Sequence, residues 1–376
     1  MQNLAVKNVI IGAGAMGAAA AYHLARRGEE VWLVEQFALG HARGSSHGAA
    51  RIIRHSYADP DYARLMPLAY RAWRELEADA ALPLFIRTGG VSFNPSSVSY
   101  VEQVAENLQA LDVPHRRMSG KLWNEANPAF GLPADYDVVF EPDAGMLTAS
   151  KAVATQIELA SRLSPKTRVL PETPVRRIDL DGSRPVVVTD DLTIEAERLI
   201  VAAGSWVGRL LPDLALPVRP TRQQVLYFRP GDRAPFEIAR FPVFIYMGES
   251  PDQAFYGMPD FQGLGVKVAR HGGPDADPDN PDPEVGEAYR DLVRDFLRAH
   301  IPALGSADIG LTEVCLYTIA PGERFLVDFH PARSDVLIAS PCSGHGFKFS
   351  CLIGRVLADL AANGATDVPI DAWKRV

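Results

Sequence analysis

Two short apolar runs near the start of the chain enclose a glycine-rich segment. Residues 6–11 and 31–34 are rich in Val, Ile and Leu, and each run has the length of a buried strand. The segment between them keeps an apolar periodicity through Leu24 and reaches Gly28, which predicts a helix that ends there. The pattern therefore predicts a strand, a helix and a second strand in one βαβ unit.

The turn between the first strand and the helix has the spacing G-x-G-x-x-G, formed by Gly12, Gly14 and Gly17. Gly12 permits a tight turn, Gly14 lets the backbone approach a pyrophosphate, and Gly17 allows close packing of helix on strand. The start of the helix adds an anion site. Glu35 ends the second strand, where a carboxylate can bind both ribose hydroxyls, which argues against a 2′-phosphate and NADP. Together these features indicate a dinucleotide site.

Helical periodicity recurs in four later segments, 61–80, 98–111, 150–162 and 284–300. On the last of these helices we expect a buried side made of Leu292, Val293, Phe296 and Leu297.

Strand patterns divide into two groups. An apolar segment at 197–204 runs into a glycine and predicts a buried strand that returns the chain to the parallel sheet. Strands are expected at 84–93 and 137–140, and the acidic, Pro-rich segment 272–283 predicts an exposed loop. A separate, largely antiparallel sheet is expected from 218–228, 243–247, 254–258 and 265–270.

Composition excludes several classes of function. The 38 basic and 46 acidic residues leave a net charge of −8, which argues against a nucleic-acid binder. Three cysteines in 376 residues, all in the last fifth of the chain, do not form a disulfide framework. The apolar run at 9–22 is too short to span a bilayer, and no other run approaches the roughly 18 residues required. We therefore expect a cytoplasmic protein without membrane segments.

Two arginines follow the dinucleotide motif at Arg51 and Arg54. On a helical turn, residues three positions apart lie on one side, so the pair could bind a carboxylate beside the nucleotide. A solvated basic turn explains the same spacing equally well. Lys348 stands in the first turn of a helix that runs to about Ala361, where a cation is unfavourable unless an anion binds there.

Cys315 and Tyr317 alternate on a strand pattern, which puts their side chains on one face. His345 lies in a glycine-rich turn with Gly344 and Gly346. A lone cysteine on a strand is ordinarily a small core residue, and a loop histidine ordinarily has local partners. The occurrence of both stretches together with a dinucleotide fold indicates a functional site more specifically than either residue does alone.

The dinucleotide fingerprint, the run Arg-Ile-Ile-Arg-His at 51–55 and the run Gly-His-Gly-Phe-Lys-Phe-Ser at 344–350 carry a family resemblance. From about residue 6 to 360 the sequence resembles the monomeric sarcosine oxidase and N-methyltryptophan oxidase family of flavoprotein amine oxidases, in the D-amino-acid-oxidase-like superfamily. The resemblance implies an α/β fold with a Rossmann-like FAD-binding domain of the glutathione-reductase type. A second, α+β substrate domain on a mainly antiparallel sheet would complete it. The expected FAD-binding domain is 1–85, 142–217 and 322–376, and the expected substrate domain is 86–141 and 218–321.

The resemblance also implies roles for single residues. Cys315 resembles the cysteine that is linked covalently to the flavin 8α-methyl carbon. Arg54 and Lys348 resemble the pair that holds the substrate carboxylate, Arg51 the residue packed against the flavin, and Lys267 the lysine where O₂ reacts. His271, Tyr256, Tyr317 and His345 fall on active-site positions. Expected contacts to FAD are Gly12, Gly14, Gly17, Glu35, Ser45, Arg51, Val175, Gly204, Cys315, Gly344, Gly346 and Lys348.

The activity implied is oxidation of a secondary amino acid such as sarcosine, with O₂ reduced to hydrogen peroxide by a monomer that has no metal site. The substrate stays open, because Ala50 and the segment 318–325 depart from the family pattern and 244–247 shapes the pocket. Two alternatives also stay open. One is a dehydrogenase of proline or pipecolate type with an acceptor other than oxygen, and the other is a subunit that binds flavin without turnover.

Overall fold

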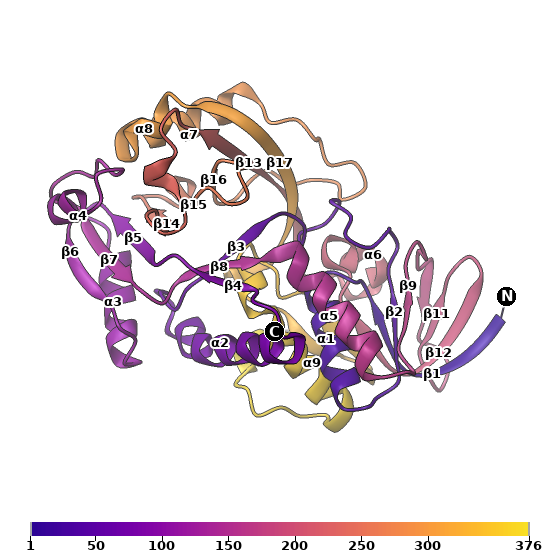
Figure 1. The fold of residues 1–376 in the computed structure, drawn as a ribbon. Helices are drawn as coiled ribbons and strands as arrows, with labels where there is room; N and C mark the ends of the chain where they lie inside the picture. Colours follow the sequence, from indigo (N-terminus) through magenta and orange to yellow (C-terminus); the bar gives the residue numbers. More distant parts are fainter. Residues whose placement is uncertain (1, 375–376) are drawn as a thin grey trace.

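The N-terminal strand lies inside an eight-stranded sheet in the computed structural model, which describes residues 2–374 (Figure 1). β1 (Gln2–Ile11) pairs in parallel with β2 (Val31–Val34) on one side and β12 (Leu192–Val201) on the other. β9 (Arg168–Leu170) and β19 (Arg333–Ala339) extend the parallel part. The antiparallel strands of this sheet are β10 (Arg177–Asp179), β11 (Val186–Val188) and β18 (Val327–His330).

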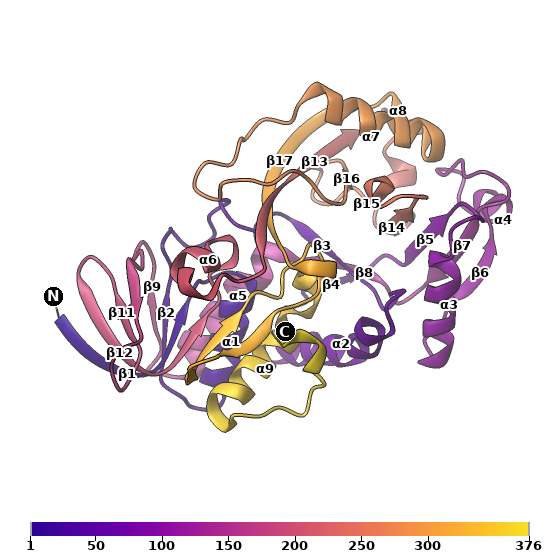
Figure 2. The ribbon, with the colours of Figure 1, turned by 180° about the vertical axis from the view of Figure 1, so that it is seen from behind.

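Alternate residues of β1 face opposite sides of this sheet. Ile10 lies in the core beneath four helices, whereas Val9 and Ile11 pack on the other side with α6 (Val207–Leu210). Gly354 lets its helix, α9 (Ser350–Asn363), approach α1 (Ala15–Arg26) closely, because a Cβ built on Gly354 would lie 2.4 Å from the Cβ of Ala19. The four helices, visible together in Figure 2, are α1 (Ala15–Arg26), α2 (Pro60–Ala80), α5 (Ala149–Leu163) and α9 (Ser350–Asn363).

The second sheet also has eight strands, and only its β14–β5 pair is parallel among the described residues. The core of this half is aromatic. Phe296 of α7 (Glu287–His300), a helix that packs on this sheet, stacks on Phe255 at a centroid distance of 4.2 Å. The helices of this half are α3 (Tyr100–Ala110), α4 (Gly120–Ala126), α7 (Glu287–His300) and α8 (Pro302–Gly305). The strand order is β17 (Asp308–Ile319), β13 (Arg219–Arg229), β16 (Val266–Arg270), β15 (Ala254–Met258), β14 (Val243–Met247), β5 (Gly90–Asn94), β7 (Asp137–Glu141) and β6 (Arg116–Ser119).

A small third sheet joins the two halves. β3 (Ala50–Ile53) and β4 (Phe85–Arg87) flank β8 (Gly145–Thr148). The expected helical turn around Arg51 is therefore wrong, because residues 50–53 pair with a strand almost a hundred positions later. The expected strand at 84–93 is two strands, separated at Gly89, whose φ of +70° ends the first.

The expectations for the remaining elements are largely confirmed, with one error on α7. Val293, Phe296 and Leu297 are buried as expected, but Leu292 is 40% exposed. The apolar stripe of α7 is therefore narrower than the sequence pattern predicts. The segment 272–283 has neither helix nor strand and is mostly exposed.

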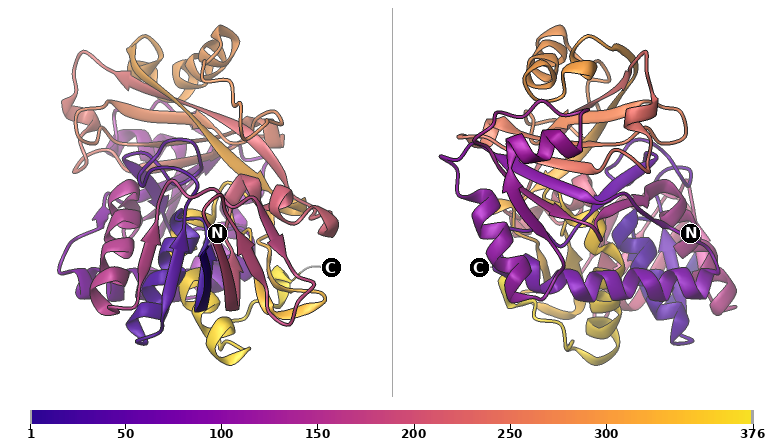
Figure 3. Two further views of the ribbon diagram at one scale, coloured as in Figure 1. Left: turned by 90° about the vertical axis from the view of Figure 1, so that its right-hand side faces the viewer. Right: turned by 60° about the vertical axis from the view of Figure 1, so that its left-hand side comes forward.

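The fold class is confirmed: a partly parallel α/β sheet stands beside a mainly antiparallel one (Figure 3). The first sheet takes its strands from residues 2–34, 168–201 and 327–339, and the second takes them from 90–141 and 219–319. The division of the chain into two domains at the expected boundaries stays a prediction. Within residues 2–374, no helix has the length and apolar character needed to cross a membrane.

Candidate active site

Two cavities meet between the sheets. The glycine cavity, about 750 Å³, is bordered by Gly12, Gly14, Glu35, Val175 and Gly204. The arginine cavity, about 380 Å³, is bordered by residues that include Arg51, Arg54, Lys267, Cys315 and Lys348. Six residues border both cavities, so one elongated molecule can cross from one to the other. These six are Ala15, Met16, Ser45, Ser46, His47 and Cys342.

The glycine turn has the geometry that its spacing predicts. Gly12 has a φ of +101°, and a Cβ there would lie 2.5 Å from the Ala202 carbonyl oxygen. A Cβ on Gly17 would lie 1.8 Å from the Gly12 carbonyl oxygen. Gly17 does not border the cavity, so it acts by letting α1 start directly beneath the turn.

Glu35 is 6% exposed and points its carboxylate at the backbone of this turn. Its oxygens accept hydrogen bonds from the N–H groups of Ala13, at 2.8 Å, and Phe37, at 3.0 Å. Burial would raise the pKa of the carboxyl, but hydrogen bonds from His41 and these two N–H groups outweigh it and lower the pKa. Oε1 already faces both Phe37 N–H and His41, whereas Oε2 accepts from Ala13 and retains a lone pair for a ribose hydroxyl.

Arg51 holds the wall between the cavities in place. Its guanidinium donates to the carbonyl oxygens of Ser45 at 3.0 Å and His47 at 2.6 Å, and it lies 5.8 Å from the centroid of the Phe347 ring. His47 itself carries a buried Nε2 atom without a hydrogen-bond partner in the described part of the chain. Burial, and then Arg51, lowers the pKa of His47 to about 4, so its ring is neutral near neutral pH.

Arg54 and Lys348 form a cationic pair with no acidic partner among the described residues. Arg54 lies over the Tyr57 ring at 4.5 Å, and its Nη1 atom is buried without a hydrogen-bond partner. Lys348 is 7% exposed and donates to the Tyr57 hydroxyl and the His345 carbonyl oxygen, both at 2.9 Å. Burial first, and then Arg54, lowers the pKa of Lys348 well below its usual value. Such a pair is stabilised when an anion binds between its members.

A chain of hydrogen bonds supports Lys348 from behind. Because Lys348 donates to the Tyr57 oxygen, the Tyr57 hydroxyl is free to donate to Nδ1 of His345 at 3.0 Å. Nε2 of His345 then donates to the carbonyl oxygen of Glu323 at 2.9 Å. Burial, and then Lys348, lowers the pKa of His345 well below its usual value, which agrees with this neutral tautomer.

Lys267 on β16 and Cys315 on β17 border the arginine cavity from the two strands that flank β13. Lys267 is 5% exposed and has its Nζ atom 5.7 Å from the centroid of the Tyr227 ring. Burial, and then Arg51, lowers the pKa of Lys267 to about 8. Cys315 is 8% exposed, and burial raises the pKa of its thiol although Arg51 and Lys267 oppose the shift.

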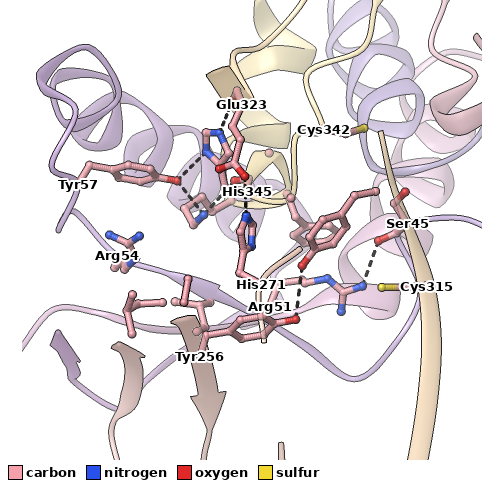
Figure 4. Close-up of a pocket in the computed structure, with 18 of the residues that line it drawn as sticks. Ser45, Arg51, Arg54, Tyr57, Tyr256, His271, Cys315, Glu323, Cys342 and His345 are labelled. Carbon is pink, nitrogen blue, oxygen red and sulfur yellow. Dashed lines mark hydrogen bonds and ion pairs between the residues drawn. The ribbon is translucent and has the colours of Figure 1, made fainter. Parts of the chain in front are cut away.

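The cavity also contains two aromatic hydroxyls and a contact between a histidine and a carboxylate. The hydroxyl oxygens of Tyr256 and Tyr317 are 3.4 Å apart, and burial raises the pKa of Tyr256 to about 12. His271 Nε2 lies 3.0 Å from Glu323 Oε1. Figure 4 shows Arg54 beside Tyr57 on one side of the cavity and Cys315 on the other. A Cβ on Gly344 would lie 2.5 Å from His271, which explains glycine there.

The structure thus brings together the residues expected from the sequence and adds others. Gly344, Gly346 and His345 border the arginine cavity as expected for the 344–350 run. Sequence reasoning took Cys342 for a packed thiol, but it borders both cavities. Sequence reasoning missed several residues of the cavity. One of them, Glu313, could have been predicted, because it stands two positions before Cys315 on one strand and therefore shares its face. The missed residues with a polar side chain are Ser46, His47, Tyr57, Asp59, Tyr62, Tyr100, Glu313 and Glu323.

Comparison with known proteins identifies the family. The profile of the FAD dependent oxidoreductase family (DAO) matches residues 7–360. The chain belongs to this family. Among its relatives, the monomeric sarcosine oxidase of Bacillus sp. (strain NS-129) is 34% identical over 97% of this chain and 95% of that protein. The N-methyl-L-tryptophan oxidase of Yersinia pestis (strain Pestoides F) is 32% identical over 97% of both.

The DAO fold is also seen among solved structures. NikD, an unusual amino acid oxidase essential for nikkomycin biosynthesis, superposes with a TM-score of 0.85 over 99% of this chain and 97% of that one, at 22% identity. As a member of the DAO family, the protein is an FAD-dependent oxidoreductase. Its residues fit that cofactor: the turn leaves no room for a side chain at Gly12 or Gly17, and His47 Nε2, which has no partner within residues 2–374, belongs to a residue that borders both cavities.

Proposed function

We propose that the protein is a flavin-dependent oxidase of secondary amino acids, with sarcosine or another N-methyl amino acid as substrate. The observation that carries this proposal is the cationic pair Arg54 and Lys348, which has no acidic partner among residues 2–374 and lies in a cavity continuous with the glycine cavity. Lys348 is buried, and so is the Nη1 atom of the half-buried Arg54. A substrate carboxylate is the anion that this pair suits best. The names of the relatives support the same substrate class.

FAD would extend across both cavities. Gly12, Gly14, Glu35, Val175 and Gly204 would hold the adenosine diphosphate part, with Ser45 and Arg51 at the junction. Gly344, Gly346 and Lys348 would border the flavin ring, and Gly17 would support the turn. When bound, FAD supplies a two-electron acceptor for hydride from the carbon next to the amine nitrogen.

The residues around the substrate would bind and orient it. Arg54 and Lys348 would clamp the carboxylate, and the chain through Tyr57 and His345 would keep the Lys348 ammonium aimed at it. His271, Tyr256 and Tyr317 would surround the amine and favour its neutral form. Burial raises the pKa of both tyrosines, so they act as hydrogen-bond donors and not as bases. The imine product would then hydrolyse in water.

Oxygen would react beside Lys267. Its buried Nζ atom borders the arginine cavity and forms no ion pair within residues 2–374. An ammonium there stabilises the negative charge that develops when O₂ takes an electron, which leads to hydrogen peroxide. We further propose that Cys315 links covalently to the flavin 8α-methyl carbon and that the protein is a cytoplasmic monomer.

A screen of peroxide release tests this function. Purified protein is mixed in air with sarcosine, N-methyl amino acids, proline and pipecolate, and the flavin absorbance is followed with the same compounds without oxygen. We expect anaerobic bleaching of the flavin and stoichiometric peroxide in air with at least one N-methyl amino acid. Bleaching without peroxide would establish a dehydrogenase instead. A flavin that stays oxidised with every compound would establish a binding subunit.

A further inference from the structure

Glu313 is an acidic residue inside the arginine cavity. It stands on β17 two residues before Cys315, so both side chains lie on the same face of the strand. Its Oε2 atom accepts a hydrogen bond from the Tyr227 hydroxyl at 2.8 Å. A Cβ built on Gly48 would lie 3.7 Å from this oxygen and 3.2 Å from Arg51 Nη1, so the carboxylate and the guanidinium border the same gap.

Tyr227 connects Glu313 to Lys267. On the paired strands β13 and β16, Tyr227 stands directly opposite Lys267. The Lys267 Nζ atom lies 5.7 Å from the centre of the Tyr227 ring, whose hydroxyl donates to Glu313. The ring thus separates an ammonium from a carboxylate in the cavity, where Lys267 is buried and Glu313 is half-buried.

The other groups that face Lys267 are cationic or neutral. From the loop before β3, His47 is neutral near neutral pH because burial lowers its pKa to about 4. Arg51 on β3 is a cation and acts against a second cation. Cys315 on β17 and the hydroxyls of Tyr227 and Tyr256 stay uncharged, since burial raises their pKa values. Within residues 2–374, Glu313 is therefore the anion that offsets Arg51 at Lys267.

We propose that Glu313 is a positioning residue that keeps Lys267 protonated beside the flavin and so sets the upper pH limit for reaction with oxygen. The inference rests on the proposed role of Lys267. An ammonium is needed to stabilise the charge on oxygen, so the oxygen rate falls as pH rises and Lys267 loses its proton. Without Glu313 only the Arg51 charge remains, and this fall moves to lower pH.

The size of the effect follows from the geometry. The contact of Lys267 with the Tyr227 ring and the hydrogen bond from the Tyr227 hydroxyl to Glu313 together allow at most about 11 Å between the ammonium and the carboxylate. At an effective dielectric constant of about 20, the Glu313 charge shifts the midpoint of the fall in oxygen rate by about one pH unit. A shorter separation gives a larger shift. Loss of the hydrogen bond alone, with the carboxylate retained, leaves the midpoint nearly where it was.

The test measures reoxidation of holoenzyme that has been reduced with dithionite, so that it does not depend on the amine substrate. Reduced protein is mixed with O₂ by stopped flow from about pH 6 to about pH 10, which brackets the range in which Lys267 titrates. In Glu313→Gln the midpoint of the falling limb should move down by about one pH unit. In Tyr227→Phe, which keeps the Glu313 carboxylate, the midpoint should stay in place. It should also stay in place in Glu323→Gln, which removes a different carboxylate of the same cavity.

Three further variants make the outcome decisive. Glu313→Ala should repeat the shift if Glu313→Gln fails to hold FAD, and Glu313→Asp, which keeps the charge, should leave the midpoint in place. Lys267→Met should reoxidise slowly at every pH. If Lys267→Met kept the wild-type rate, the proposed oxygen site itself would be wrong. If Lys267→Met were slow but both neutral variants at Glu313 followed the wild-type pH profile, only the role of Glu313 would be overturned.

Discussion

Arg54 offers the sharpest test of the carboxylate site, because its Nη1 atom has no hydrogen-bond partner within residues 2–374. This atom is buried and forms no hydrogen bond in the described part of the chain, so a bound carboxylate would add a bond without breaking one. A charge-assisted bond of this kind contributes about 1.5–3 kcal/mol. Arg54→Met should therefore weaken carboxylate binding by about 10- to 100-fold.

The same change should have little effect on stability. Arg54 loses its position over the Tyr57 ring at 4.5 Å, which costs about 0.5–1 kcal/mol. The loss is offset because Arg54 repels the buried Lys348 ammonium, the second cause of its lowered pKa. Binding and stability should thus separate in this variant.

The assay is titration of the holoenzyme with acetate, followed through the flavin absorbance, together with KM for the best substrate of the peroxide screen. Arg116→Met is the matched control, since Arg116 lies over the Phe140 ring at 5.2 Å but does not border the cavity. The control should bind acetate as the wild type does. Unchanged acetate affinity in both Arg54→Met and Lys348→Met would refute the carboxylate site.

Three further predictions concern the hydrogen-bond chain, the turn and the cysteine. Tyr57→Phe removes the acceptor of Lys348 and the donor to His345, which should lower stability in thermal melts by about 1–3 kcal/mol; unchanged melting would mean that neither group depends on Tyr57. Gly17→Ala brings a Cβ to 1.8 Å from the Gly12 carbonyl and should yield protein without FAD. Gly28→Ala, with nothing within 4 Å, should keep its flavin at a cost of about 1 kcal/mol. Acid-precipitated wild type should stay yellow and Cys315→Ala should release its flavin, whereas a colourless wild-type pellet would exclude the covalent bond.

Local patterns in the sequence predicted several elements at their observed bounds. The strands at 31–34, 243–247 and 254–258 begin and end where the sequence places them. Glutamates flank the first apolar run, and proline or glycine lies close to both ends of the other two. The turn before α1 follows from the glycine spacing, and the helix follows from the apolar periodicity through Leu24. These features depend on backbone conformations and side-chain periods that residues carry with them wherever they are in the chain.

Elements that depend on distant partners were predicted poorly. Residues 50–53 form a strand because β8 offers them hydrogen bonds, and nothing within the segment itself selects a strand over a helical turn. The short strands β10 and β11 exist as an edge of the first sheet, next to β12. Leu292 continues the apolar side of α7 in the sequence, but the buried face of the helix does not extend to it, and its side chain is 40% exposed.

The sequence by itself determined the dinucleotide turn, the α/β class and the residue types of the site. Only the tertiary structure decided which of these side chains are charged, paired or free. Tyr57 and His345 are 288 positions apart, yet they share a hydrogen bond. Glu313 reaches Lys267 only across the ring of a tyrosine on a third strand. Burial and electrostatic neighbours arise from packing, and packing joins residues whose separation along the chain carries no signal.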